Sequence, residues 1–141
     1  MAANTAPIFI KNRKVAVVTI VPADTTTLKT LMTADATNGS RLLAINVVTD
    51  DTAANVVGMY VQIGGAGTSY PLGVKSVALR SGDPTNVSAL PSVNLLDLAA
   101  VAGLDPDGSL GLGPGDIVKV GVQATVTAAK TVTCMAIYGD Y

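Results

Sequence analysis

Apolar and polar residues alternate along several short stretches of the chain, which predicts β-strands. The clearest stretch is Asp116–Val126, in which Val118, Val120 and Val122 share one face and Lys119 lies on the other. Successive strand residues point to opposite faces, so this spacing is typical of a strand with one buried side. Further strands are expected at Lys14–Val21, Arg41–Thr49, Val56–Gly64, Tyr70–Leu79 and Lys130–Tyr138.

Two segments are ambiguous between helix and strand. In Asp24–Asp35 the leucines and methionine have helical spacing and Asp24 could cap a helix, but the density of threonine favours a strand. Ser92–Gly103 is the best helix candidate, with Ser92 as N-cap and Gly103 as the stop. It could equally be a short strand followed by a connection.

Turn residues separate these stretches. Asn38-Gly39, within Thr37–Ser40, provides the positive φ angles that tight hairpins need. A second hairpin is expected at Thr127–Ala129, before the last strand. Pro71 and Gly73 place the beginning of their strand at a sheet edge or a bulge. The pattern as a whole predicts a mainly β fold, an antiparallel jelly roll or β-sandwich of about eight strands with at most one short helix. Residues 11–141 form the expected single domain, behind a flexible N-terminal arm over residues 1–10.

Composition indicates an uncharged surface. Charged residues make up only 13% of the 141 residues, against about 25% in an average protein. The net charge of −1 excludes an electrostatic case for binding nucleic acid. No stretch approaches the roughly 20 apolar residues that span a membrane, and the apolar run at Pro7–Ile10 is too short for the core of a signal peptide.

Residue types also argue against catalysis. The chain has no histidine, and all ten acidic residues are Asp. The absence of histidine removes the usual nucleophile-activating base, and Cys134 lies in a strand pattern typical of a buried small residue. Asp50 and Asp51 are expected to be solvated loop charges. Asp105–Ser109 begins like a calcium loop but lacks its later glycine and glutamate, which favours a plain turn. We therefore expect no enzyme activity, no metal and no cofactor.

Basic residues gather before the first strand. Lys11, Arg13 and Lys14 are three of the nine basic residues. The simpler interpretation is a solvated beginning of a strand. The alternative is an electrostatic contact with an acidic surface of a partner.

Three short motifs occur in order along the chain: Asn38-Gly39-Ser40-Arg41, Leu112-Gly113-Pro114-Gly115 and Gly139-Asp140-Tyr141. With the Pro7–Phe9 segment and the Tyr60–Gly65 strand, they resemble the small tailed-phage structural proteins that decorate or cement the icosahedral head shell. This resemblance implies a jelly-roll-like fold, the major capsid protein as partner, synthesis in the host cytoplasm and a place on the head surface of the virion. A tail- or fibre-associated receptor-binding module is the alternative.

Self-association is expected from strands that are apolar on both faces. Lys14–Val21 has Val15, Val17 and Val21 on one side, and Ala16, Val18 and Ile20 on the other. In Arg41–Val48 the pattern assigns Leu43, Ile45 and Val47 to one side, opposite Leu42, Ala44 and Val48. One face of a sandwich strand ordinarily meets water, so another chain is expected to cover the second face. A trimer is favoured over a dimer. Val17, Ile45 and Tyr141 are the apolar interface candidates, although Tyr141 could instead pack on its own domain.

Overall fold

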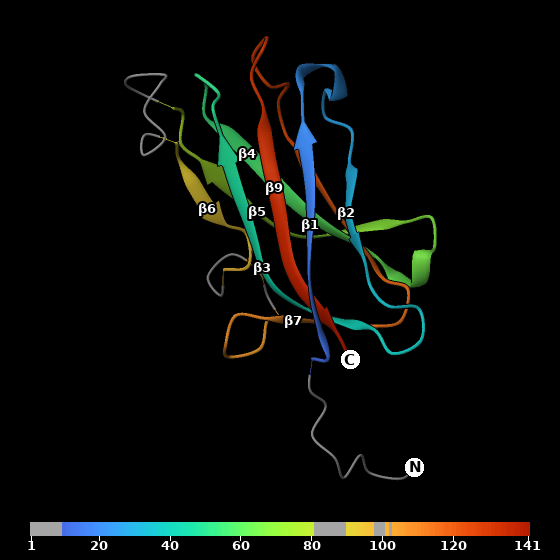
Figure 1. The fold of residues 1–141 in the computed structure, drawn as a ribbon. Helices are drawn as coiled ribbons and strands as arrows, with labels where there is room; N and C mark the ends of the chain where they lie inside the picture. The colour runs from blue at the N-terminus through green and yellow to red at the C-terminus, as the bar shows by residue number, and fades with distance from the viewer. Residues whose placement is uncertain (1–9, 81–89, 98–100, 102) are drawn as a thin grey trace, which may run out of the picture.

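The computed structural model describes residues 10–80, 90–97, 101 and 103–141, and there the protein is a sandwich of two antiparallel sheets (Figure 1). Sheet A has the order β1 (Asn12–Ile20), β9 (Val132–Asp140), β3 (Ser40–Thr49) and β6 (Ser92–Asn94), with β7 (Leu110–Leu112) also paired to β3. Sheet B has the order β2 (Lys29–Thr33), β8 (Ile117–Val122), β4 (Asn55–Gln62) and β5 (Ser69–Val77). The expected mainly β fold is confirmed.

The strand pairing is nested, as in a jelly roll. β4 pairs with β5, β3 with β6, β2 with β8 and β1 with β9, all antiparallel. The chain thus runs out and back as one long folded ribbon that is rolled into two sheets. Pairing of β3 with β9 and of β4 with β8 completes the sheets. Two opposed sheets with this wrapping are the jelly-roll arrangement.

The turn expected at Thr37–Ser40 is present, whereas the hairpin expected at Thr127–Ala129 is wrong as a strand pairing. The turn at Thr37–Ser40 leads from β2 in sheet B to β3 in sheet A, and the one at Thr127–Ala129 leads from β8 to β9, again between sheets. Asn-Gly still provides the positive φ, which is 80° at Gly39. A turn sequence specifies local backbone angles, whereas the sheet that receives the next strand depends on which faces are buried together.

Smaller differences concern the connections. The Asp24–Asp35 segment contains the favoured strand, shortened to β2, and a 3₁₀ helix η1 at Pro22–Asp24 precedes it. Of the two alternatives for Ser92–Gly103, the structure has the short strand at its beginning, β6 at Ser92–Asn94, and residues 98–100 and 102 lie outside the described residues. β7 and a second 3₁₀ helix, η2 at Ile63–Gly65, fall within segments expected to be turns or strand.

The inward faces of the two sheets form one core. The alternation predicted for β8 is correct, since Val118, Val120 and Val122 are all buried. In β4 the predicted alternation ends at Gln62, so Ile63 is 60% exposed at the beginning of η2. The other large, fully buried side chains are Ile20, Leu42, Ile45, Val47, Val57, Met59, Val77, Val126 and Val132.

A β-bulge in β3 changes the faces expected there. The register with β9 shifts between Leu42 and Ala44, so Leu43 is the extra residue. Leu42 therefore lies on the core side with Ile45 and Val47, and Leu43 is 37% exposed. A single inserted residue reverses the side of every residue beyond it. A simple alternating pattern in the sequence does not reveal such an insertion.

The two termini of the described chain lie at the same end of the sandwich. Figure 1 shows the C-terminus beside the beginning of β1, and the register pairs Asn12 with Asp140. The expected arm over residues 1–10 lies outside the described residues except for Ile10, whose side chain occupies the space above Gly139. Among the described residues, no helix has the length and apolar character needed to cross a membrane.

Candidate functional site

Asp140 is the centre of a polar cluster at the end of the sandwich where β1, β3 and β9 meet. The carboxylate accepts a 2.7 Å hydrogen bond from the hydroxyl of Ser40 and forms an ion pair with Lys14. Lys14 and then Ser40 hold the pKa of Asp140 below its ordinary value, and Asp140 in turn raises the pKa of Lys14. Asp140 is buried, so these bonds hold a charge that water does not reach well.

Gly39 allows the neighbouring strands to approach this cluster. A Cβ atom at Gly39 would lie 2.3 Å from the carbonyl oxygen of Leu112, and the φ of 80° is itself unfavourable for other residues. The carbonyl of Gly39 accepts a hydrogen bond of 3.3 Å from the backbone N–H of Tyr141. The side chain of Tyr141 lies beside Gly111 and is partly buried on its own domain. The three motifs that carry the resemblance therefore meet at one place in the fold.

Two aspartates hold the adjoining turns. The Asp35 carboxylate accepts from the backbone N–H of Thr37 at 3.0 Å and of Asn38 at 2.8 Å, which stabilises the turn before β3. The Asp116 carboxylate accepts from the backbone N–H of Gly64 and of Gly113, each at 2.8 Å. The second pair joins η2 to the turn after β7. The carboxylates of Asp35 and Asp116 are therefore occupied in stabilising turns of the fold.

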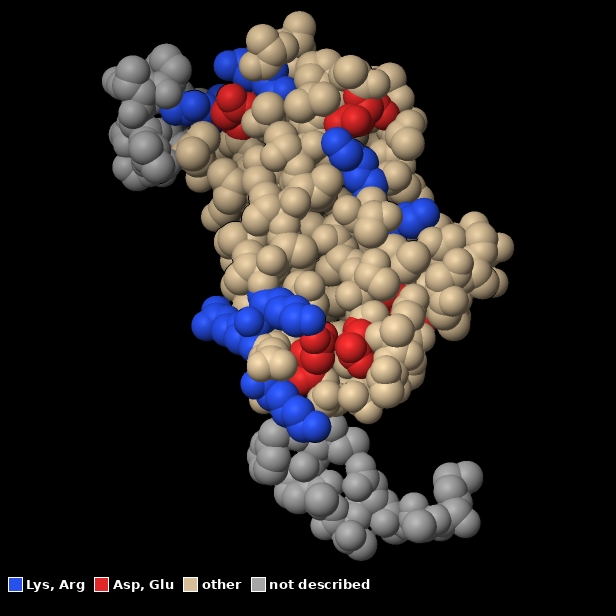
Figure 2. All heavy atoms as spheres, turned by 45° about the vertical axis from the view of Figure 1, so that its right-hand side comes forward, with Lys and Arg blue, Asp and Glu red and all other residues tan. Residues whose placement is uncertain are grey.

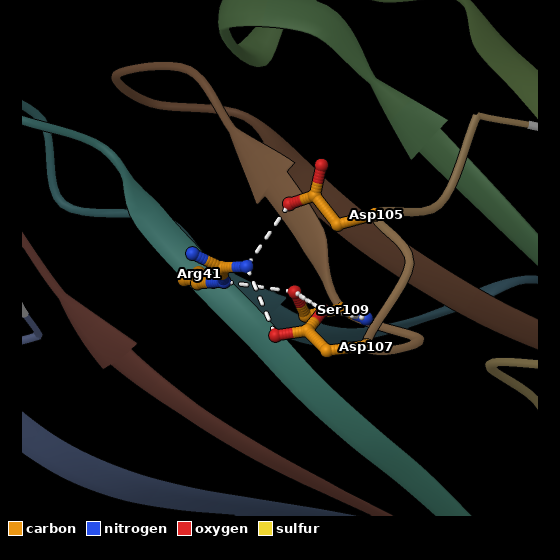
Figure 3. Close-up of polar contacts among 4 residues, drawn as sticks. All are labelled: Arg41, Asp105, Asp107 and Ser109. Atoms are coloured by element: carbon orange, nitrogen blue, oxygen red, sulfur yellow. Dashed lines mark hydrogen bonds and ion pairs between the residues drawn. The ribbon is translucent and has the colours of Figure 1, made fainter.

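Arg41 binds both aspartates of the segment that resembles the start of a calcium loop (Figure 3). Its Nη2 lies 3.1 Å from Asp105 and 3.1 Å from Asp107, and its Nε donates to the hydroxyl of Ser109 at 2.8 Å. Hydrogen bonds from Ser109, followed by Arg41, lower the pKa of Asp107. One guanidinium already pairs with both carboxylates, so the plain-turn interpretation fits this segment. Within the described residues, no three His, Cys, Asp or Glu side chains gather as metal ligands would.

Asp51 corrects the expectation of two solvated loop charges. It is only 1% exposed and accepts hydrogen bonds from the N–H of Ala53 at 3.0 Å, from Asn55 Nδ2 at 3.1 Å and from the N–H of Thr127 at 3.1 Å. Burial would raise the pKa of Asp51, but bonds from Thr127, Ala53 and Asn55 outweigh it and lower the pKa to about 2. The ionised carboxylate of Asp51 links the β3–β4 loop to the connection between β8 and β9. Its partners are all groups that hold loops of the same domain, so its role is structural.

The structure separates the interface candidates. Lys11, Arg13 and Val17 are exposed, Val17 to 59%. Lys14 belongs to the Asp140 cluster. Ile45 is fully buried in the core of its own domain, so, against expectation, it is not available to a second chain.

The outward face of sheet A is uncharged along its centre and apolar at the β1 side. The register places Val15 beside Ile137, which lies beside Ala44, and Val17 beside Met135. We call this surface the sheet A face, defined by Val15, Val17, Thr19, Ala44, Asn46, Val48, Thr133, Met135 and Ile137. Val15 and Val17 are exposed, whereas their β9 and β3 neighbours are half-buried. Figure 2 shows charged side chains toward the ends of one side of the molecule, with a wide uncharged area between.

The outward face of sheet B is covered by its own side chains. Gly58 and Gly121 are paired across β4 and β8. The ring of Tyr60 lies over Gly58, where an added Cβ would be 2.9 Å from Cε2, and Leu28 lies over Gly121 in the same way. This face also carries Lys119, paired with Tyr60 in the register. The two faces therefore differ. The side chains of Tyr60 and Leu28 cover the centre of the sheet B face, and no described side chain covers the sheet A face in this way.

Sequence reasoning missed most of the sheet A face. The apolar pattern of the first strand identifies Val15 and Val17, whereas the pattern of Lys130–Tyr138 predicts a strand without assigning Met135 and Ile137 to an exposed face. The signal was present, since Met135 and Ile137 alternate with the buried Cys134 and Ala136. Burial confirms Cys134 as a core residue and raises the pKa of its thiol to about 12.

An open hollow of about 370 Å³ lies beside β5 and β6, lined partly by Lys75, Asn94 and Asp107. Lys75 pairs with Asp97 at 2.5 Å in its wall. Comparison with known proteins adds no assignment to any of these surfaces: neither the protein-family models nor the curated proteins give a match to this chain.

Proposed function

We propose that this chain is a decoration, or cement, protein that binds the outside of an icosahedral phage head and stabilises the assembled shell. The observation that carries the proposal is the convergence of the three resembling motifs. Ser40 bonds to Asp140, and Tyr141 bonds to Gly39, so residues from the first and last motifs form one structural unit. Short motifs that share one architectural role are a better basis for a resemblance than three unrelated matches.

The chemistry of the described residues supports a role that depends on surface rather than on reaction. The motif residues are occupied in holding the fold, as the ion pair of Arg41 with Asp105 illustrates. The sheet A face is an extended surface that these fold-holding contacts do not use, and it is uncharged along its centre. A protein that binds only the assembled lattice stabilises that lattice by mass action and needs no catalytic group. The partner that this proposal requires is the major capsid protein.

The first experiment is compositional. Purified virions of the phage that encodes this chain should contain a 14.2 kDa protein that stays with the head fraction after tails are separated. Recovery with the head supports decoration. Recovery with tails or fibres supports the receptor-binding alternative, and absence from virions contradicts both.

The second experiment tests the binding surface. Shells that lack the chain are mixed with purified protein and sedimented, and bound protein is quantified. We expect saturable binding to expanded shells and a higher temperature of shell disruption. Met135→Lys, in the middle of the sheet A face, should weaken binding, whereas Val74→Lys on β5, where Val74 is 48% exposed, should not. Equal binding by both variants would assign the contact to another surface.

A further inference from the structure

We propose that two copies of this chain pair through their β1 strands, antiparallel and about a two-fold axis, so that sheet A continues from one subunit into the next. The inference is independent of the proposed function. It starts from the edges of the two sheets, because an unpaired edge strand exposes backbone hydrogen-bonding groups that can pair with another chain.

Three of the four edges are blunted by features that prevent pairing. β5 contains Pro71 and a bulge in its register with β4, since Met59 pairs with Gly73 and the next residue with Pro71. β2 has only five residues and a register shift between Thr30 and Met32. The far edge of sheet A consists of β6 and β7, with three residues each. Short, bulged and proline-containing strands are the usual ways to protect an edge.

β1 has none of these protections. It is nine residues long, contains no proline, and keeps an unbroken register with β9 from Asn12 to Ile20. Among the described strands it pairs with β9 alone. One contact limits the free length: Lys29 Nζ donates to the carbonyl of Thr19 at 2.8 Å. With respect to the described residues, the segment from Arg13 to Val18 is therefore the open part of the edge.

The distribution of exposed apolar side chains agrees with an occupant at this edge. Within the sheet A face the β9 and β3 residues are half-buried, and exposure is greatest in β1, at 56% for Val15 and 59% for Val17. A strand added to β1 would cover these two side chains and pair with the exposed backbone N–H and C=O groups of the edge. A partner that only lay across the face would leave the edge unpaired.

Charge favours the antiparallel over the parallel orientation for a second copy. The basic residues Arg13 and Lys14 lie at one end of β1, and parallel pairing would place them against their own counterparts. Antiparallel pairing about Ala16 places Val15 beside the partner's Val17 and Arg13 beside the partner's Thr19. Near Thr19 lies the carboxylate of Asp24, which is 3.0 Å from Lys29 Nζ. The basic end of each strand thus meets an end where Asp24 and Lys29 form an ion pair, rather than a second basic end.

Symmetry then favours a dimer over the trimer that the sequence suggested. A closed ring of three requires β1 to pair with a different edge of its neighbour. Each other edge is short, bulged or interrupted by proline. Pairing of β1 with itself is closed after two subunits and leaves no free copy of that edge.

The first test is sedimentation equilibrium of the full chain at micromolar concentration. We expect the wild type at twice 14.2 kDa, about 28 kDa. Val17→Lys and Val15→Lys should raise the dissociation constant at least about tenfold, because each places two lysines at the seam. Val74→Lys is the matched control on the blunted β5 edge and should leave the dimer unchanged. Circular dichroism verifies that each variant is folded. A monomeric wild type, or equal dissociation constants for Val17→Lys and Val74→Lys, would overturn the proposal.

The second test fixes orientation by disulfide cross-linking. Val15→Cys and Val17→Cys proteins, mixed in equal amounts and oxidised, should form a cross-linked heterodimer, and either alone should cross-link poorly. Native Cys134 is buried and should not react. Efficient cross-linking of Val15→Cys or Val17→Cys only with itself, or of neither combination, would overturn pairing about Ala16. This readout does not depend on shells, so its failure is distinguishable from failure of the decoration proposal.

Discussion

The hydroxyl of Ser40 donates a 2.7 Å hydrogen bond to the carboxylate of Asp140, and the two residues are 100 positions apart in the chain. Ser40 begins β3, and Asp140 ends β9. The same hydroxyl accepts a 2.9 Å hydrogen bond from the backbone N–H of Asp35. One small side chain therefore joins the turn before β3 to the last strand.

Replacement of Ser40 by alanine should lower the free energy of unfolding by about 1–3 kcal/mol, because a part-buried N–H and a buried carboxylate each lose a partner. Denaturant unfolding followed by circular dichroism measures the change. Ser76→Ala, at an exposed position of β5, is the control and should have little effect. Similar losses in both variants would show that the Ser40 bonds contribute nothing specific.

Asp51 predicts a loss of stability in acid. Its pKa of about 2 in the folded state lies below the ordinary value of 3.8. A lowered pKa stabilises the fold above the unfolded value, by about 2 kcal/mol, and this contribution disappears as pH falls through the folded pKa. Asp51→Asn should therefore be less stable than the wild type at pH 7, with the gap closing toward pH 2. Asp105→Asn is the exposed control, and a gap that persisted at low pH would contradict the assignment.

Alanine substitutions at Gly39 and Gly108 distinguish the cost of a positive φ from the cost of a steric clash. Both have a φ of 80°, but an added Cβ would contact the Leu112 carbonyl at Gly39 and nothing within 4 Å at Gly108. Gly39→Ala should cost about 1–3 kcal/mol more than Gly108→Ala, since both share the cost of the positive φ. Thermal unfolding of the two variants gives the difference directly. Equal melting temperatures would mean that the β3 turn and β7 can move apart freely.

Ile45 and Val17 should respond oppositely to the same substitution. Ile45→Asp places a charge in the core and should unfold the protein, a loss above about 4 kcal/mol. Val17→Asp changes a side chain that is 59% exposed and should leave a folded domain. Circular dichroism and thermal melting distinguish the two. A folded Ile45→Asp protein would contradict the core position of that residue.

Cys134 should be unreactive until the protein unfolds. The thiol is fully buried, and burial raises its pKa to about 12, so almost no thiolate is present at neutral pH. Labelling with a chromogenic disulfide reagent should follow the unfolding transition as denaturant is added. Fast stoichiometric labelling of the native protein would show that the core opens readily around β9.

Local sequence determined the strands because alternation is a property of neighbouring residues. Val118, Val120 and Val122 lie in the core as the pattern predicts, and Pro71 and Gly73 correctly predict a bulged edge strand. The sandwich class also followed from the number of strands and turns. The bulge at Leu43 did not follow: it moves Leu42 to the side of Ile45, and no glycine or proline in that strand indicates an inserted residue.

Composition and alternation by themselves thus determined a low-charge β-sandwich with apolar residues on both faces of its first strand. Only the tertiary structure decided which strands pair, since β1–β9 and β2–β8 are adjacent in space and distant in sequence. It also decided that Asp51 is buried, because its partner Thr127 is 76 positions away. Likewise it placed Ile45 inside and Val17 outside, although both are β-branched residues in apolar strands. The physical reason is that burial and pairing depend on contacts between distant segments, and the local pattern records only the preference for a strand.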